Sequence, residues 1–196
     1  MKAGQSAVTS ERFATGFTYK DYIVQIKVNK DQFEKFYQTG QLVAQDREFF
    51  RKAAQSPNGI GKMMVIGEDW CPDVFRGMPV VARIAEAAGV ELRIFPRDQN
   101  LDIMNEFLKE GKYMSMPVVV FYTKDLGHIC HWMERPESAN QERAGIEAEV
   151  KKEKSGASET EVRTAVRERT QARYPTWQQE TVREIRQMLV EKLGLK

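Results

Sequence analysis

The chain has 196 residues, enough for one sizeable core, and 41% of them are hydrophobic, as in globular rather than disordered proteins. Its 30 basic and 28 acidic residues leave a net charge of +2, which argues against nucleic acid as a partner. Two cysteines cannot form a disulfide framework, and no apolar run approaches the roughly 20 residues of a membrane helix, so we expect a cytoplasmic protein with neither secretory signal nor membrane contact.

The N-terminal residues 1–58 are predicted to form a helical extension. Thr18 and Asp21 resemble a capping box, and Asn29 stands where it can cap the next helix. The turn-rich segment 56–61 marks a boundary. The apolar spacing predicts helices over residues 19–26, 30–39 and 41–55.

Residues 59–136 are predicted to form the core of the protein. Short apolar strands alternate there with helices in the order β-α-β-α-β-β. The first two strands should be parallel and the last two antiparallel, so the fold class is α/β with a mixed sheet. The predicted strands are 62–67, 90–95, 117–122 and 128–133, and the predicted helices are 72–89 and 100–111.

Residues 137–196 are predicted to form a C-terminal helical extension that packs on the core. Eight acids and eight bases are interleaved between residues 137 and 173, which favours a solvated helix face over an arm that grips a partner. The segment 155–158 should break this region. The last helix has an apolar stripe that should dock on the core or on a second subunit: Val182, Ile185, Met188, Leu189 and Leu193.

Cys71 lies at the predicted turn between the first strand and the helix that follows it. Pro72 suits the first helical position because it has no N–H to leave unpaired. The thiol therefore stands at a helix N-terminus, whose amides and dipole favour the nucleophilic thiolate.

These residues resemble the thioredoxin family over about residues 60–138. The resemblance rests on Trp-Cys at the end of a strand, a helix that starts at the cysteine, and Met116-Pro117 before a strand, with Pro117 46 residues after Cys71. It implies a thioredoxin-like fold, a central mixed sheet flanked by helices, here with N- and C-terminal helical extensions. It further implies that Pro117 is a cis-proline beside the thiol and that the backbone of Met116 pairs with an extended substrate segment.

The sequence departs from that family at the second cysteine of its Cys-x-x-Cys site. Val74 occupies the position and cannot resolve a disulfide, so the site is a monothiol site. An apolar residue near Val65 replaces the buried acid that many thioredoxins have. Cys130 is expected to be a buried hydrophobe too far from Cys71 for a disulfide.

No metal or cofactor is expected. On a regular strand His128 and Cys130 share a face and His131 points away, so too few ligands converge.

The charges around Cys71 predict an ordinary thiol. Glu68, Asp69 and Asp73 oppose the helix dipole, and Arg76 offsets part of their effect, which leaves an expected pKa at or slightly above the usual value of about 8.5. Asp73 is interpreted as an acid that complements the dipole rather than as a proton acceptor.

The sequence leaves two interpretations open for Trp70 and two for the pair Glu137 and Ser138. Trp70 is either a substrate platform or a cap on the core. Glu137 and Ser138 are similar to the pair with which glutathione transferases hold a glutathione backbone, but ordinary helix capping is favoured.

The sequence thus supports a monothiol oxidoreductase that exchanges disulfides at Cys71. In that hypothesis Trp70, Asp73, Met116 and Pro117 line the substrate site, and the partners are protein or low-molecular-weight disulfides. The alternative is a catalytically silent binding module with the same fold. A regulatory cysteine modified by peroxide or thiols is a third, weaker interpretation.

Overall fold

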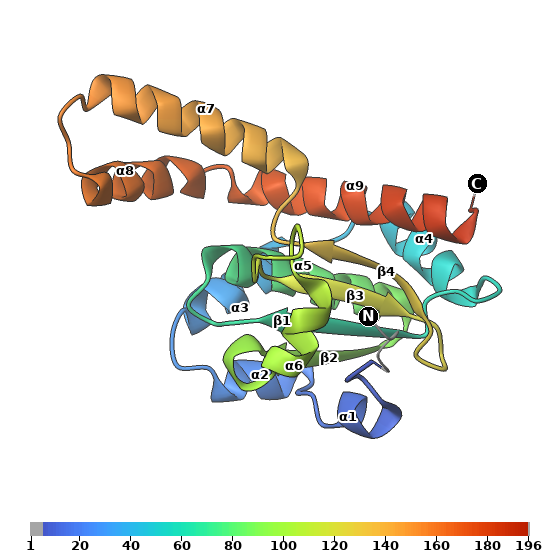
Figure 1. Cartoon of the computed structure of the whole chain (residues 1–196). Helices are drawn as coiled ribbons and strands as arrows, with labels where there is room; N and C mark the ends of the chain where they lie inside the picture. The colour runs from blue at the N-terminus through green and yellow to red at the C-terminus, as the bar shows by residue number, and fades with distance from the viewer. Residues whose placement is uncertain (1–5, 196) are drawn as a thin grey trace.

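A computed structural model describes residues 6–195 of the chain as a central sheet with helices on both faces (Figure 1). The strand order is β2-β1-β3-β4, with β1 and β2 parallel and the other two pairs antiparallel. The strands are β1 (Lys62–Gly67), β2 (Glu91–Pro96), β3 (Val118–Tyr122) and β4 (His128–Met133). The α-helices are α1 (Ser10–Ala14), α2 (Tyr19–Gln25), α3 (Lys30–Thr39), α4 (Ala44–Gln55), α5 (Pro72–Ala88), α6 (Leu101–Met104), α7 (Glu137–Glu153), α8 (Glu159–Gln171) and α9 (Tyr174–Leu193), and the 3-10 helices are η1 (Arg97–Gln99) and η2 (Asn105–Phe107).

The alternation of side chains along β1 divides the core into two layers. Met63 and Val65 point to the face covered by α3, α4, α5 and α9, where the larger apolar cluster lies. Met64 and Ile66 point to the other face, which α1 and α6 cover. Because both faces are covered, β1 is buried from Met63 to its end at Gly67, and the turn after it leads to Cys71.

The predicted α/β class and the order and direction of the strands are confirmed. The N-terminus of α2 is also as predicted, since Thr18 Oγ1 accepts a hydrogen bond from the Asp21 amide at 3.2 Å. Asn29 precedes α3 but does not cap it, because its side chain donates to the Asp69 carbonyl at 2.9 Å. The predicted helix over 100–111 is wrong in its second half, where α6 gives way to η2 and then to a turn.

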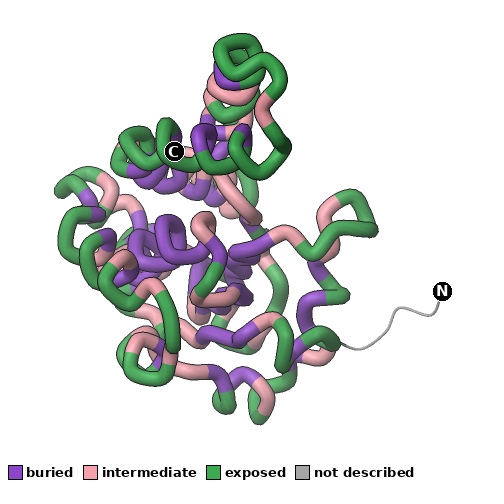
Figure 2. Tube along the Cα trace, turned by 90° about the vertical axis from the view of Figure 1, so that its left-hand side faces the viewer, coloured by how far each residue is buried: buried purple, intermediate pink, exposed green. Residues whose placement is uncertain are grey.

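The C-terminal helices divide into a docked and a projecting part. The apolar stripe of α9 packs into the larger core cluster, as predicted, against α4, α5 and β4. The antiparallel pair of α7 and α8, which we call the α7–α8 hairpin, projects beyond the sheet (Figure 1) and is mostly exposed (Figure 2). Within residues 6–195, no helix is long and apolar enough to cross a membrane.

Ion pairs and a small apolar core stabilise the hairpin. Exposed i,i+4 pairs join Lys151 to Glu147 and Arg163 to Glu159, as expected of a solvated helix face. Ser158 starts α8 with a capping box, so the predicted break at 155–158 is confirmed. The hairpin's own apolar contacts come from Val150, Val162, Ala165 and Val166.

Candidate functional site

Cys71 is the N-cap residue of α5, after the short turn that follows β1. Its carbonyl accepts hydrogen bonds from the amides of Val74 at 3.0 Å and Phe75 at 3.1 Å. Pro72 occupies the first helical turn, as the sequence predicts. Gly67 allows the helix to start this close to the strand, because a Cβ there would lie 2.9 Å from both methyl groups of Val74. The position of Cys71 is thus set by the hydrogen bonds of its carbonyl to α5 and by the close packing of Val74 on Gly67.

The Met116–Pro117 peptide bond is cis, and it lies beside the thiol. Cys71 Sγ points to the carbonyl oxygen of Met116 at a distance of 4.0 Å. Met116 and Pro117 are buried, and Cys71 is 9% exposed. The structure therefore brings together the thiol and the two residues that the family resemblance implied.

Trp70 lies on the surface rather than in the core. Its side chain is 50% exposed, and the guanidinium of Arg97 lies 5.2 Å from the ring centroid. Of the two interpretations of Trp70, the core cap is therefore wrong. The role of substrate platform stays a prediction.

Asp73 is the centre of a compact charged cluster. Arg135 binds its carboxylate with Nε at 3.1 Å and also with Nη2, and Arg76 Nη2 lies 2.5 Å from Asp73 Oδ1. Burial by itself would raise the pKa of Asp73, but the hydrogen bonds from Arg135 and the charge of Arg76 outweigh it and lower the pKa. A carboxylate held ionised in this way is a poor proton acceptor, which agrees with the interpretation of Asp73 as a structural acid.

The pKa of the Cys71 thiol is raised, chiefly by burial and then by the charge of Asp73. The amides of Val74 and Asp73 and the charge of Arg135 act in the opposite direction. The prediction from the sequence overestimated the effect of Glu68 and Asp69 on the pKa of Cys71, since neither is among the charges that shift it. Glu68 accepts a hydrogen bond from the Asp98 amide at 2.8 Å, and Asp69 accepts from the Lys27 amide at 2.8 Å, so both join loops to the turn before Cys71.

We expect this raised pKa to appear directly in the alkylation of Cys71. The rate of reaction with iodoacetamide should rise about tenfold per pH unit through neutral pH, with its inflection above the usual thiol value of about 8.5. The measurement is the pH dependence of the rate by intact mass, in a Cys130→Ala background. An inflection below pH ~7 would contradict the assigned burial of the thiol.

Cys130 is a buried residue of the edge strand β4, and both cysteines are free. Burial raises its pKa to about 11, as befits an unreactive core residue.

The prediction that the His128 and His131 side chains point to opposite faces of the strand is wrong. A β-bulge at Ile129 shifts the alternation of β4, so His128 and His131 lie side by side with ring nitrogens 3.3 Å apart. Across residues 6–195, no group of three or more His, Cys, Asp or Glu side chains is placed to hold a metal ion.

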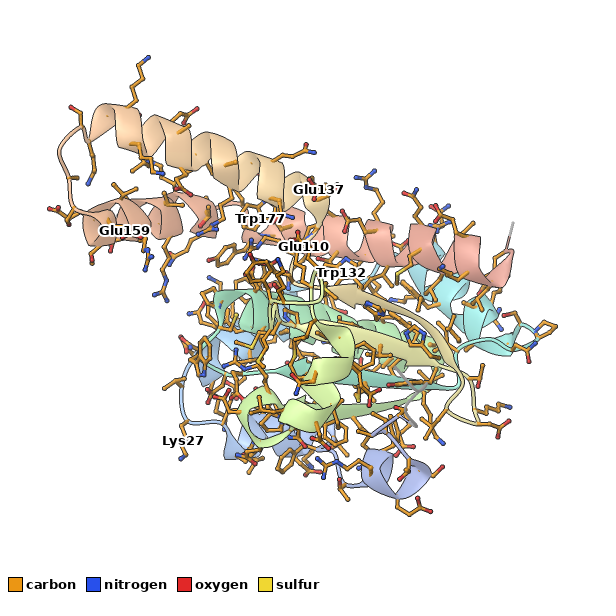
Figure 3. The ribbon with its side chains drawn as sticks, in the orientation of Figure 1. Lys27, Glu110, Trp132, Glu137, Glu159 and Trp177 are labelled. Carbon is orange, nitrogen blue, oxygen red and sulfur yellow. The ribbon has the colours of Figure 1, made fainter. Side chains whose placement is uncertain are left out.

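Glu137 and Ser138 are the first two residues of α7. The cap is supplied by Glu184 of α9, whose carboxylate accepts from the Glu137 amide at 2.6 Å and from Trp132 Nε1 at 3.0 Å. Figure 3 shows Glu137 and Trp132 at the junction of the hairpin with the core. The expected local capping is therefore replaced by a tertiary contact.

Arg135 is the site residue that sequence reasoning missed. It follows β4, and β4 pairs with β3 so that Met133 lies opposite Val118, next to Pro117. A basic residue after the last strand of the predicted hairpin must therefore return to the edge that carries the cis-proline. That signal was present in the sequence.

Comparisons with known proteins agree with this geometry. The sequence model of a thioredoxin family matches residues 16–151, which extends beyond the predicted core on both sides. No curated protein matches the sequence. A protein of unknown function from Pseudomonas aeruginosa is 14% identical with a TM-score of 0.66, over 94% of this chain and 98% of that one. An HIV epitope-scaffold protein is 12% identical with a TM-score of 0.64, over 94% and 99% of the two chains. At these identities the two structures show the fold alone.

Proposed function

The chain belongs to the thioredoxin family, and from that membership we propose that it exchanges disulfides through Cys71 as a monothiol site. The observation that carries the proposal is the approach of Cys71 Sγ to within 4.0 Å of the carbonyl of the cis Met116–Pro117 bond. A thiol at a helix N-terminus beside such a backbone can attack a disulfide held along that backbone.

The proposed reaction needs two thiol–disulfide exchanges. The Cys71 thiolate attacks one sulfur of a disulfide, a Cys71–sulfur bond forms, and the second sulfur leaves as a thiolate that takes up a proton. An external thiol, from a protein or a small molecule, then attacks the mixed disulfide and releases Cys71. The buried Val74 beside Gly67 leaves no second thiol in the active-site turn to perform this step internally.

The surroundings of the thiol support an extended substrate. Among residues 6–195 the Met116 amide has no hydrogen-bond acceptor, so it is available to an incoming strand. Three apolar side chains near the site in the sequence are exposed. Trp70 directly precedes Cys71, and Tyr113 and Met114 lie in the loop before the cis bond. Such exposed apolar groups are suited to contact the side chains of a partner.

The test is the formation of a mixed disulfide on Cys71. We expect incubation with an aromatic disulfide at pH 8 to add one leaving-group mass to the wild-type protein, slowly because the thiol is mostly protonated. Cys71→Ser should abolish the adduct, whereas Cys130→Ala should keep it. The readout is intact mass against time.

The same experiment separates the proposal from the silent binding module. Absence of an adduct on Cys71 after long incubation would favour the binding module. An adduct on Cys130 alone would contradict the proposal that Cys71 is the residue that exchanges disulfides. A Cys71 adduct that added thiols fail to release would leave the second step without support.

A further inference from the structure

A cavity of about 380 Å³ lies between the first turn of α5 and the α7–α8 hairpin. Pro72 and Asp73, the residues directly after Cys71, form part of its wall, and Tyr174 and Trp177 of α9 form another part. Figure 3 shows Trp177 near the junction of the hairpin with the core and Glu159 at the far end of the hairpin. The cavity therefore lies beside the proposed site of exchange, on the side away from β2.

Five arginines line this cavity against one acid, Asp73: Arg76, Arg135, Arg143, Arg163 and Arg167. Three of them form ion pairs. Arg76 pairs with Asp73, Arg135 pairs with Asp73 and Glu134, and Arg163 pairs with Glu159 outside the cavity. Neither Arg143 nor Arg167 forms an ion pair with any residue between 6 and 195. Two of the five arginines of the cavity thus have no ion-pair partner among the described residues.

Arg76 is the strongest indication of a ligand. It is 1% exposed, and its guanidinium lies 5.3 Å from the ring centroid of Tyr174 and 5.1 Å from that of Trp177. Its Nη2 is held by Asp73 Oδ1 at 2.5 Å, but its Nε has no acceptor among residues 6–195. A buried guanidinium nitrogen without an acceptor is costly, and an oxyanion that enters the cavity would supply one.

We propose that this cavity binds a small organic molecule carrying two or more carboxylate or phosphate groups. The planar guanidinium fork suits both anions, and the aromatic rings and Val166 offer surface to an apolar body. The volume is that of a small-molecule site, which favours such a ligand over an acidic peptide. That the anion belongs to the disulfide attacked by Cys71 is a further step, and it rests on the function proposed above.

Binding is tested without the reactive thiol, in the Cys71→Ser protein, by calorimetry with tricarballylate and with pyrophosphate. We expect at least one to bind with a Kd below about 1 mM, and the better of the two identifies carboxylate or phosphate. Arg143→Gln/Arg167→Gln should weaken that binding about tenfold or more, since each lost charge-assisted hydrogen bond is a strong one. Lys20→Gln/Lys124→Gln, the same charge change at exposed positions outside the cavity, should leave the Kd unchanged.

Three results would overturn the assignment of this cavity. The first is no heat of binding for either anion, and the second is equal binding by the Arg143→Gln/Arg167→Gln protein. The third is tighter binding of a hexaglutamate peptide than of either small anion, which would point to an acidic peptide partner instead.

A kinetic test then asks whether the anion belongs to the disulfide. In a Cys130→Ala background we compare dithiobis(nitrobenzoate), which has two carboxylates, with neutral dithiodipyridine. The ratio of their rates at Cys71 should fall about tenfold in Arg143→Gln/Arg167→Gln and stay constant in Lys20→Gln/Lys124→Gln. A constant ratio in both would refute this step while the exchange function stands, whereas no reaction with either disulfide would refute the exchange function and leave the calorimetric result valid.

Discussion

Replacing Asp73 with alanine is expected to lower the free energy of unfolding by about 3 kcal/mol. The carboxylate is 13% exposed, accepts hydrogen bonds from Arg135 and is the counter-charge of Arg76, so its removal leaves the buried Arg76 unpaired. The measurement is urea unfolding at pH 7. The control is Asp31→Ala. Asp31 is an exposed acid in the first turn of α3, at the position that Asp73 has in α5, so its replacement should change the free energy of unfolding by less than about 0.5 kcal/mol.

The pH dependence of this effect has a definite sign. The pKa of Asp73 is lowered in the folded protein, so its ionisation contributes stability above the unfolded pKa of about 3.9. That contribution is lost as the pH falls through the folded pKa. The difference between the wild type and Asp73→Ala should therefore be full at pH 7 and smaller at pH ~3. A difference that grew in acid would contradict the ion pairs assigned to Asp73.

Replacing Phe33 with alanine is expected to destabilise the protein by about 3–4 kcal/mol. Phe33 of α3 is fully buried, and its ring packs edge-on against Tyr22 at 5.8 Å and Phe75 at 6.4 Å between centroids. Phe75 belongs to the first turn of α5, so the N-terminal helices support the helix that begins at Cys71. The same urea titration measures the change.

Val24→Ala provides the control for Phe33→Ala. Val24 is 70% exposed on α2, so its truncation should cost less than about 0.5 kcal/mol. A small effect of Phe33→Ala would mean that residues 1–58 are an appendage that the rest of the chain does not need for its stability. The predicted boundary at residue 58 is tested in this way.

The site as a whole combines a buried thiol with a positively charged cavity beside it. Cys71 is kept protonated mainly by burial, so it should react slowly and depend on a partner that is held in place. The cis bond provides backbone contacts on one side, and the arginine-lined cavity provides charge beside Pro72 and Asp73. Selectivity would then come from binding rather than from an activated thiol.

The sequence by itself determined the fold class and the place of Cys71 between a strand and a helix. Apolar runs and turn residues predicted all four strands, because these signals are local in the chain. The Trp-Cys-Pro turn and Met116-Pro117 predicted the site, because a strand-to-helix turn has few backbone solutions. The second half of the predicted helix over 100–111 failed, since tertiary contacts override helix propensity over so short a segment.

Only the tertiary structure decided the electrostatics of that site. The distance of each charge from Cys71 depends on which loop its side chain contacts, so Glu68 and Asp69 lost the influence that their sequence positions suggested, and Arg135 gained it from 64 residues away along the chain. The bulge that pairs His128 with His131 is likewise invisible in the spacing of the strand. The cavity beside α5 exists only because α9 docks on the core and directs the α7–α8 hairpin over the first turn of that helix. Local interactions along the chain fixed the backbone position of Cys71, and long-range packing fixed which charges and which cavity lie beside it.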